Sequence, residues 1–188
     1  PMAVCFPESV EDISRIMQLC SGERIPVIAY GAGSGVCGAT VPEEGGIILD
    51  TKRLCRLLDL NRENLTITVE PGMLGERLED LLNQEGLTLG HFPSSINCST
   101  IGGYVACRSA GQYSSRYGKI EDLTLGLEVV LPDGTVARYG VLGGGHRHDP
   151  MLAVQLGAEG TLGIVTQVCL KVEPLPEKFD FKGFAFLD

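Results

Sequence analysis

Apolar residues recur every three or four positions in two stretches of the chain, which is the spacing that places them on one face of a helix. The first stretch predicts a helix over residues 9–20, with Ser9 at its cap. The second predicts a helix over residues 74–85 that ends at Gly86. A shorter helix is expected over residues 151–156. The pattern therefore predicts helices in both halves of the chain.

Short runs of β-branched and aromatic residues separate these helices, and turn-forming residues bound most of the runs. The clearest turn is Pro132-Asp133-Gly134, which lies between two such runs and predicts a hairpin. The expected strands cover residues 25–30, 46–50, 57–60, 65–70, 123–131, 135–139, 164–172 and 184–187. Helices and strands mixed in this way predict an α+β fold.

Residues 91–118 show no periodic pattern. Loops of this length in compact domains are usually either functional or disordered. The stretch also contains apolar residues, among them Ile101 and Val105, that could bury themselves in a core. We therefore expect it to be ordered and functional.

Four glycines fall within residues 31–38, directly after an expected strand. Glycine lets main-chain N–H groups approach a ligand closely, so this loop is a candidate for binding a phosphate group. A Rossmann site would need a helix to begin here, and residues 41–46 cannot supply one. A P-loop would need a lysine where Ala39 stands. A plain tight turn is the alternative interpretation.

Charge and cysteine usage narrow the function further. The chain of 188 residues has a formal net charge of −9, which argues against nucleic acid or an anionic membrane as a partner. No apolar run reaches the length of a membrane span, so we expect no integral membrane segment. Seven cysteines without a Cys-x-x-Cys pair indicate a reducing, cytoplasmic location. His146 and His148 follow three glycines in an expected loop, and we predict no metal site there.

Several segments, taken in order and with their spacing, resemble the FAD-binding domain of the vanillyl-alcohol oxidase / p-cresol methylhydroxylase (PCMH-type) flavoprotein family. Those segments are the glycine loop and residues 70–72, 93–103, 116–122 and 159–165. Residues 90–93 and 108–118 are most similar to the branch of alkyldihydroxyacetonephosphate synthase-like FAD-linked oxidases. The D-lactate and glycolate dehydrogenases are next in similarity.

The resemblance implies a fold of two α+β subdomains with the flavin between them. The first would cover residues 1–89 and the second residues 90–176. Residues 177–188 would then begin a cap domain that contacts the substrate and supplies the catalytic side chains. The implied partners are a small-molecule substrate and this cap domain or a partner subunit, and the catalytic residues stay unknown.

The resemblance also implies four cofactor-binding segments, the first of which would hold the pyrophosphate of FAD. The implied residues are Ala29, Tyr30, Gly31, Ala32, Gly33, Ser34 and Gly35; Pro93, Ser94, Ser95, Ile96, Asn97, Cys98 and Ser99; Ala106, Cys107, Arg108 and Ser109; and Glu159, Gly160, Thr161, Leu162, Gly163, Ile164 and Val165. Hydroxyl groups in the second segment could reach the ribityl chain and the phosphates, and Arg108 could balance their charge.

Many relatives bind FAD covalently through a histidine in or near the glycine loop, but residues 30–38 contain no histidine. We therefore predict non-covalent FAD. Cys37 lies in the loop and is expected to be a buried small side chain. His91 is expected to bond to the backbone, so it stays outside the catalytic set.

The favoured interpretation is an FAD-dependent oxidase or dehydrogenase, of which this chain is an incomplete part, acting on a 2-hydroxy acid such as D-lactate or glycolate. An alkyldihydroxyacetonephosphate synthase-like flavoenzyme is the runner-up for the reaction. A flavin-binding subunit without chemistry of its own is a further alternative, and its flavin would not be reduced by substrate. A structural domain without cofactor is the last, and it would be colourless.

Overall fold

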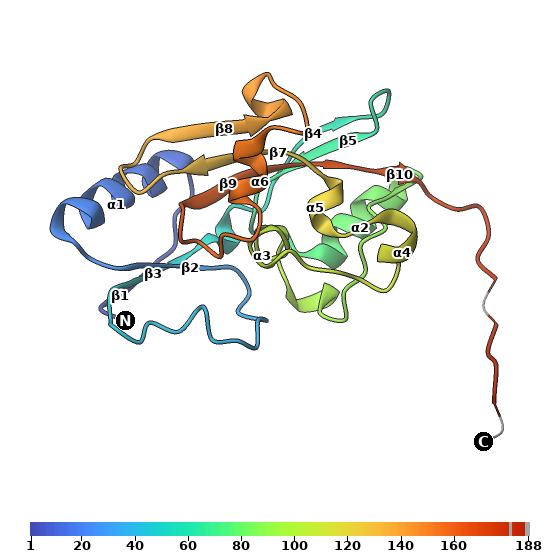
Figure 1. Ribbon diagram of the computed structural model, residues 1–188, viewed down its shortest axis with the longest axis horizontal. Coiled ribbons are helices and arrows are strands. Elements are labelled where there is room, and N and C mark those ends of the chain that lie inside the picture. Colours follow the sequence, from blue (N-terminus) through green and yellow to red (C-terminus); the bar gives the residue numbers. More distant parts are fainter. Residues whose placement is uncertain (181, 187–188) are drawn as a thin grey trace.

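The computed structural model describes residues 1–180 and 182–186, and its largest sheet has five antiparallel strands (Figure 1). In spatial order these strands are β4 (Leu57–Asn61), β5 (Thr66–Val69), β9 (Ile164–Lys171), β7 (Thr124–Val130) and β8 (Val136–Gly140). Each was expected from the sequence to within a few residues, because alternation and turn signals mark strands of this length. The pairing of β5 with β9 joins the two predicted subdomains, 1–89 and 90–176, in one sheet. The boundary between them stays a prediction.

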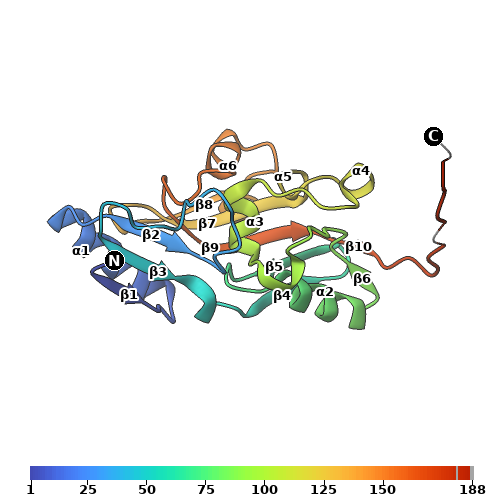
Figure 2. The same ribbon diagram turned by 90° about the horizontal axis from the view of Figure 1, so that it is seen from below.

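A smaller parallel sheet has the order β1 (Ala3–Cys5), β3 (Ile47–Asp50) and β2 (Val27–Tyr30). Parallel strands need crossover connections, and helix α1 (Val10–Glu23) lies in the one that leads from β1 to β2, the two strands on either side of β3. Ser9 caps α1 by accepting a hydrogen bond from the backbone N–H of Asp12, as the sequence predicted. Both views place α1 beside this small sheet, at one end of the molecule (Figures 1 and 2).

The second predicted helix is confirmed as α2 (Gly75–Gln84), and the third as α6 (Pro150–Gln155). Three further elements gave no sequence signal because each spans only two or three residues. They are β1 and the antiparallel pair β6 (Leu87–Thr88) and β10 (Glu173–Pro174). Short 3₁₀ turns lie at η1 (Thr51–Arg53) and η3 (Val141–Gly143).

The stretch without periodicity is ordered, as expected, and contains several short helices. These are η2 (Ile96–Cys98), α3 (Ile101–Cys107), α4 (Ser114–Tyr117) and α5 (Ile120–Leu123). None is long enough to show two full turns of an apolar face, so periodicity could not reveal them. Thr100 caps α3 by accepting from the N–H of Gly103.

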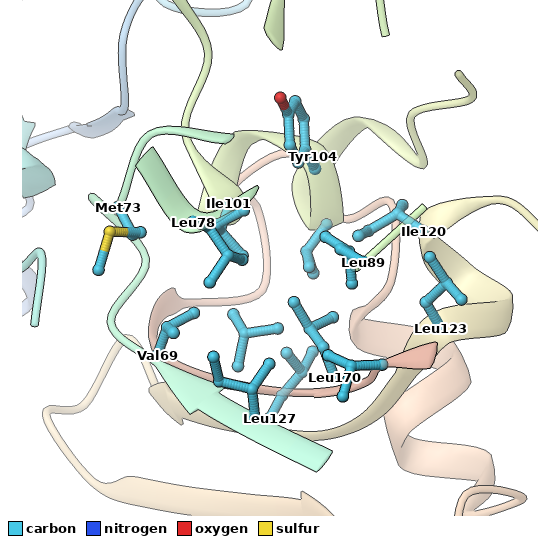
Figure 3. Packing of buried hydrophobic residues seen from close by; sticks show 14 of the residues in the cluster. Val69, Met73, Leu78, Leu89, Ile101, Tyr104, Ile120, Leu123, Leu127 and Leu170 are labelled. Atoms are coloured by element: carbon cyan, nitrogen blue, oxygen red, sulfur yellow. The ribbon is translucent and has the colours of Figure 1, made fainter. Parts of the chain in front are cut away.

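The main core lies between the large sheet and the helices α2, α3 and α5 (Figure 3). Leu127 and Leu170 extend from the sheet, and Leu78 and Ile101 extend from the helices to meet them. All four are fully buried. A second cluster, which includes Ile13 of α1, joins the small sheet to the start of β9. The two sheets are therefore fixed relative to each other by packing.

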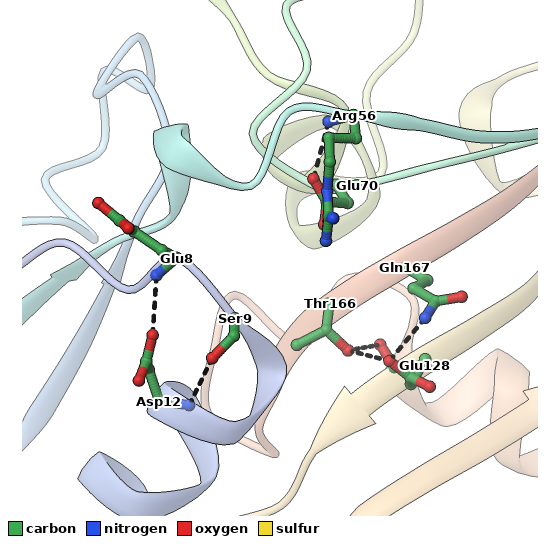
Figure 4. A network of polar contacts seen from close by, with 8 residues as sticks. All are labelled: Glu8, Ser9, Asp12, Arg56, Glu70, Glu128, Thr166 and Gln167. Atoms are coloured by element: carbon green, nitrogen blue, oxygen red, sulfur yellow. Dashed lines mark hydrogen bonds and ion pairs between the residues drawn. The ribbon is translucent and has the colours of Figure 1, made fainter.

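Two buried carboxylates add polar links between strands (Figure 4). Glu128 on β7 accepts hydrogen bonds from Thr166 at 2.9 Å and Gln167 at 3.0 Å, both on β9, and from Arg138 on β8 at 2.8 Å. Glu70 accepts from the backbone and the guanidinium of Arg56. Buried charges need such partners, and each carboxylate here has several.

The expected strand over residues 184–187 is wrong for the described part, because residues 184–186 form no regular structure and residue 187 lies outside it. Residues 177–180 and 182–186 run away from the rest of the molecule (Figures 1 and 2). A β-rich sequence pattern needs a neighbouring strand to pair with, and none of the described strands is within reach.

Candidate functional site

A cavity of about 420 Å³ lies where three parts of the fold meet. They are the glycine loop after β2, the helix α3, and the turn of residues 159–163 that leads into β9. The size is in the range of small-molecule binding sites. The candidate site is therefore built by segments far apart in the sequence, which the two sheets bring together.

The glycine loop leaves its backbone donors free. Within the described part of the chain, the N–H groups of residues 32–37 donate no hydrogen bond to protein. Gly33 has a φ of 69°, and a Cβ atom there would lie 2.3 Å from the Tyr30 hydroxyl oxygen. A side chain at this position would be excluded twice, by backbone conformation and by space. The loop can thus present main-chain donors to an anion.

The loop lies directly against the other walls. A Cβ atom on Gly31 would lie 2.4 Å from the Thr100 side-chain oxygen at the start of α3. On the turn before β9, Gly160 has a φ of 81°, and its Cβ would lie 2.9 Å from that of Ala29. These glycines are therefore required for the close approach of three segments around the cavity.

The lining carries little charge, since Glu159 is its one charged side chain among the described residues. Lys52 lies just behind the loop, where its ammonium donates to the Gly31 carbonyl oxygen at 3.2 Å and to Asp50 at 2.6 Å. An anionic ligand here would be bound mainly by backbone and hydroxyl dipoles, as expected for an acidic protein.

Hydroxyl groups supply the polar part of the opposite wall. Ser99 donates to the Ser95 carbonyl oxygen at 2.6 Å, and the two side-chain oxygens are 3.0 Å apart. The Tyr104 hydroxyl is buried and has no hydrogen-bond partner in the described part of the chain. Burial raises the pKa of Tyr104, so the hydroxyl keeps its proton at neutral pH. The hydroxyl oxygen lies against Gly75, where an added Cβ atom would be 2.1 Å from it.

These features fit FAD. The free N–H groups of the loop suit a pyrophosphate, and the serine hydroxyls of the lining suit a polyol chain. The apolar remainder of the lining suits flat aromatic rings.

The structure brings all seven implied residues of the first segment, 29–35, to the cavity. From the other segments, the lining includes Ser95, Ser99, Ala106, Cys107, Ser109, Glu159, Gly160, Gly163, Ile164 and Val165. Eight implied residues lie outside the lining: Pro93, Ser94, Ile96, Asn97, Cys98, Arg108, Thr161 and Leu162. Parts of all four segments thus line one cavity, and the assignment of these residues to FAD stays a prediction.

Arg108 shows why one of these eight lies elsewhere. Its guanidinium donates to the carbonyl oxygens of Leu156 at 3.0 Å and Ala153 at 3.3 Å, and it approaches Glu121. The side chain therefore ties the end of α3 to α6. It does not face the cavity.

Ten lining residues were absent from the implied set: Val36, Cys37, Ala39, Thr40, Thr51, Pro71, Thr100, Gly102, Gly103 and Tyr104. Most of them continue a segment already chosen, so extending each segment by a few residues would have found them. Cys37 corrects an expectation, because its side chain is exposed and not buried. The loop it lies on extends over the cavity, away from both cores.

Asp149, next to the histidines 146 and 148, caps α6 by accepting from the Met151 N–H at 2.9 Å. It also accepts from the Gly140 N–H at 2.9 Å. In the described ranges, no three His, Cys, Asp or Glu side chains gather as metal ligands would. The carboxylate thus has a structural role.

His91 does not line the cavity, but it is buried directly behind it. Its Nε2 atom lies 2.6 Å from the Ser109 side-chain oxygen, and its ring meets the Tyr104 ring edge-on at 4.9 Å. Burial lowers the pKa of His91 from 6.5 to about 4. The expected bond to the backbone is therefore wrong, because the partner is a side-chain hydroxyl.

We expect this pKa shift to make folding sensitive to acid. The unfolded chain takes up a proton at His91 below pH 6.5 and the folded chain does not, so stability falls as the pH drops from 6.5 toward 4. Between pH 8 and pH 5 the loss from this residue is about 2 kcal/mol. Urea unfolding at pH 8 and pH 5 measures how far the free energy of unfolding falls between them. In His91→Phe this fall should be smaller by about 2 kcal/mol. An equal drop in the variant would contradict the shift.

No helix in the described part of the chain has both the length and the apolar character needed to cross a membrane. A family model described as an FAD binding domain matches residues 1–140. The glycolate oxidase subunit GlcD of Bacillus subtilis (strain 168) is 39% identical over 94% of this chain and 38% of its own length. The alkyldihydroxyacetonephosphate synthase of Dictyostelium discoideum is 35% identical over 99% of this chain and 31% of its own length.

Solved structures give the same result. One described as alkyldihydroxyacetonephosphate synthase in P1 superposes with a TM-score of 0.83 at 34% identity, covering 93% of this chain and 34% of that one. The chain thus spans about a third of the length of the relatives it matches. The fold class and the family resemblance inferred from the sequence are both confirmed.

Proposed function

The chain belongs to the family of FAD-binding domains found in FAD-linked oxidoreductases, and from that premise we propose that it holds FAD for the oxidation of a 2-hydroxy acid such as D-lactate or glycolate. The observation that carries the proposal is the cavity between the glycine loop and α3, with its free backbone donors. Bound FAD would supply the two-electron acceptor that oxidation of an alcohol carbon needs.

The residues of this chain would bind and orient the cofactor. We assign the N–H groups of residues 32–37 to the pyrophosphate, since they have no acceptor in the described part of the protein. The hydroxyls of Ser95 and Ser99 would bind the polar atoms along the rest of the molecule. Lys52 would offset part of the negative charge from behind the loop.

The reacting groups that act on the substrate are proposed to come from a cap domain or a partner subunit. The lining has one charged side chain, Glu159, and none of the three histidines. Oxidising a 2-hydroxy acid requires a cation or donors for its carboxylate and a base for its hydroxyl proton. The described cavity lacks such a set, so we assign no catalytic residue here.

An alkyldihydroxyacetonephosphate synthase-like reaction is the second candidate, because relatives with that name match the chain about as well. A flavin-binding subunit without chemistry is the third.

One experiment separates these candidates. The FAD-loaded protein, together with the proposed cap domain or partner subunit, is mixed under nitrogen with glycolate, with D-lactate and with an acyl-dihydroxyacetonephosphate in turn. Loss of the visible flavin band with a 2-hydroxy acid supports the first proposal, and loss with the acyl ester alone favours the second. A flavin that only dithionite reduces would identify a binding subunit. Failure of the protein to take up FAD would overturn all three.

We predict that the FAD is held non-covalently. No described histidine lines the cavity, which leaves the thiols of Cys37 and Cys107 as its candidates for a covalent bond. Burial raises the pKa of Cys107, which disfavours its reactive thiolate. Acid precipitation should therefore leave the yellow colour in the supernatant. Colour in the pellet that disappears in Cys37→Ser would show attachment through that residue.

The cytoplasmic location stays a proposal. It rests on seven cysteines, all with free thiols in the structure, which suits a reducing compartment. Two D-lactate dehydrogenase relatives are named as mitochondrial proteins, and that location is not carried over to this chain. Fractionation of cells that express the protein would decide the point.

A further inference from the structure

His91 and Ser109 form a hydrogen-bonded pair at the back of the cofactor cavity. Ser109 contributes to the lining and His91 does not. The two side chains approach to 2.6 Å between Nε2 and Oγ. His91 is 2% exposed, so the pair is closed to solvent on the histidine side. The Oγ atom of Ser109 makes no other hydrogen bond in the described part of the chain.

The surroundings fix both partners. The Ser109 N–H donates to the Tyr104 carbonyl oxygen at 3.0 Å, and its carbonyl oxygen accepts from the Ile120 N–H at 3.2 Å. The His91 ring packs edge-on against Tyr104, whose hydroxyl points away from the labelled core side chains (Figure 3). The Ser109 backbone and the His91 ring are therefore both held in place.

The environment also selects one tautomer of His91. The ring is neutral at pH 7, because burial lowers its pKa to about 4. Its Nδ1 atom is buried without a partner among the described residues. A buried N–H without an acceptor is rarer than a buried acceptor without a donor. A proton on Nε2 avoids a buried Nδ1–H without an acceptor and makes Ser109 the acceptor of this hydrogen bond.

We propose that His91 is a positioning residue for the cofactor: its Nε2–H donates to the Ser109 oxygen and so leaves the Ser109 hydroxyl proton free to donate into the cavity. A serine facing a cavity can otherwise act as donor or acceptor. The histidine removes that choice and presents a donor to an electron-rich atom of FAD. The inference rests on the proposed FAD binding and adds a role to a residue outside the lining.

FAD titrations of the apoprotein, followed by the quenching of flavin fluorescence, test the proposal. His91→Phe keeps a ring against Tyr104 but removes the donor, and Ser109→Ala removes the hydroxyl. Each should weaken FAD binding about tenfold, and the double variant should be no weaker than either single one. His91→Gln, whose amide can donate, should stay within about threefold of the wild type.

Several results would overturn it. If the two residues acted independently, FAD binding in the double variant would be about a hundredfold weaker, which contradicts the proposal. Unchanged FAD binding in Ser109→Ala would show that the Ser109 hydroxyl does not contact the cofactor. Where His91→Phe does not fold, Ser109→Ala and His91→Gln still decide. The histidine tautomer is read separately, by ¹⁵N NMR of the ring nitrogens, and a proton on Nδ1 contradicts the proposal. If the wild type itself binds no FAD, the proposed function fails, whereas the tautomer stands as measured.

Discussion

Replacing Gly35 by aspartate should raise the dissociation constant for FAD at least a hundredfold. Gly35 lies in the middle of the glycine loop, on the cavity, and nothing described lies within 4 Å of the place where its Cβ would be. Its backbone is also outside the left-handed region. The side chain can therefore be accommodated, and its effect on binding comes from its charge.

The size of the effect follows from electrostatics. A carboxylate about 4 Å from a phosphate charge costs about 4 kcal/mol at the dielectric typical of sites near a protein surface. That energy corresponds to about a thousandfold. The loop is exposed to solvent, which screens part of the repulsion. We therefore expect the dissociation constant for FAD to rise by at least about a hundredfold.

Gly35→Asn is the matched control, because asparagine has the same shape without the charge. It should bind FAD within about fivefold of the wild type. Both variants should melt at the wild-type temperature without FAD, since the loop lies outside both cores. The comparison uses the same fluorescence titration. If Gly35→Asp bound FAD as tightly as Gly35→Asn, the loop would not hold the pyrophosphate.

The glycine loop shows what a sequence can reveal about such a site. Free backbone donors and close approach both require glycine, so the requirement is written in residue identity. All residues from 29 to 35 line the cavity accordingly. The long strands of the large sheet and the helices α1 and α2 were visible for a similar reason, since each is long enough to repeat its pattern.

Other parts of the site leave no such signal. The helix α3 has seven residues, and its role as a wall depends on pairing between strands distant in sequence. Lys52 reaches the loop only because β2 and β3 are neighbours in a sheet. Tyr104 is 2% exposed and packs in the main core, and only the fold shows that it also lines the cavity. Contacts of this kind come from tertiary pairing, which composition and periodicity do not encode.

The pairing of β5 with β9 also bears on how the site responds to distant change. It places residues from both predicted subdomains in one sheet, so the walls of the cavity share a core. A disturbance at the end of β5 should therefore reach the cofactor site through rigid packing. Pro71 and Gly72 follow that strand after Glu70.

Gly72→Ala should lower the free energy of unfolding by about 3 kcal/mol and weaken FAD binding as well. A Cβ atom on Gly72 would lie 2.3 Å from the Thr51 carbonyl oxygen and 2.7 Å from that of Leu54. Both are backbone atoms, which cannot rotate away as a side chain does. The clash must therefore move the turn itself.

The movement would reach the cavity through Pro71, which contributes to the lining and whose carbonyl oxygen accepts from the Gly102 N–H of α3 at 2.8 Å. Gly22→Ala is the control, because Gly22 lies in α1 with nothing within 4 Å of its Cβ position. It should stabilise the fold by up to about 1 kcal/mol and leave FAD binding unchanged. Urea unfolding and FAD titration of both variants give the test. Equal stability in the two variants would show that the turn after β5 yields easily, and that the wall it supports is not rigid.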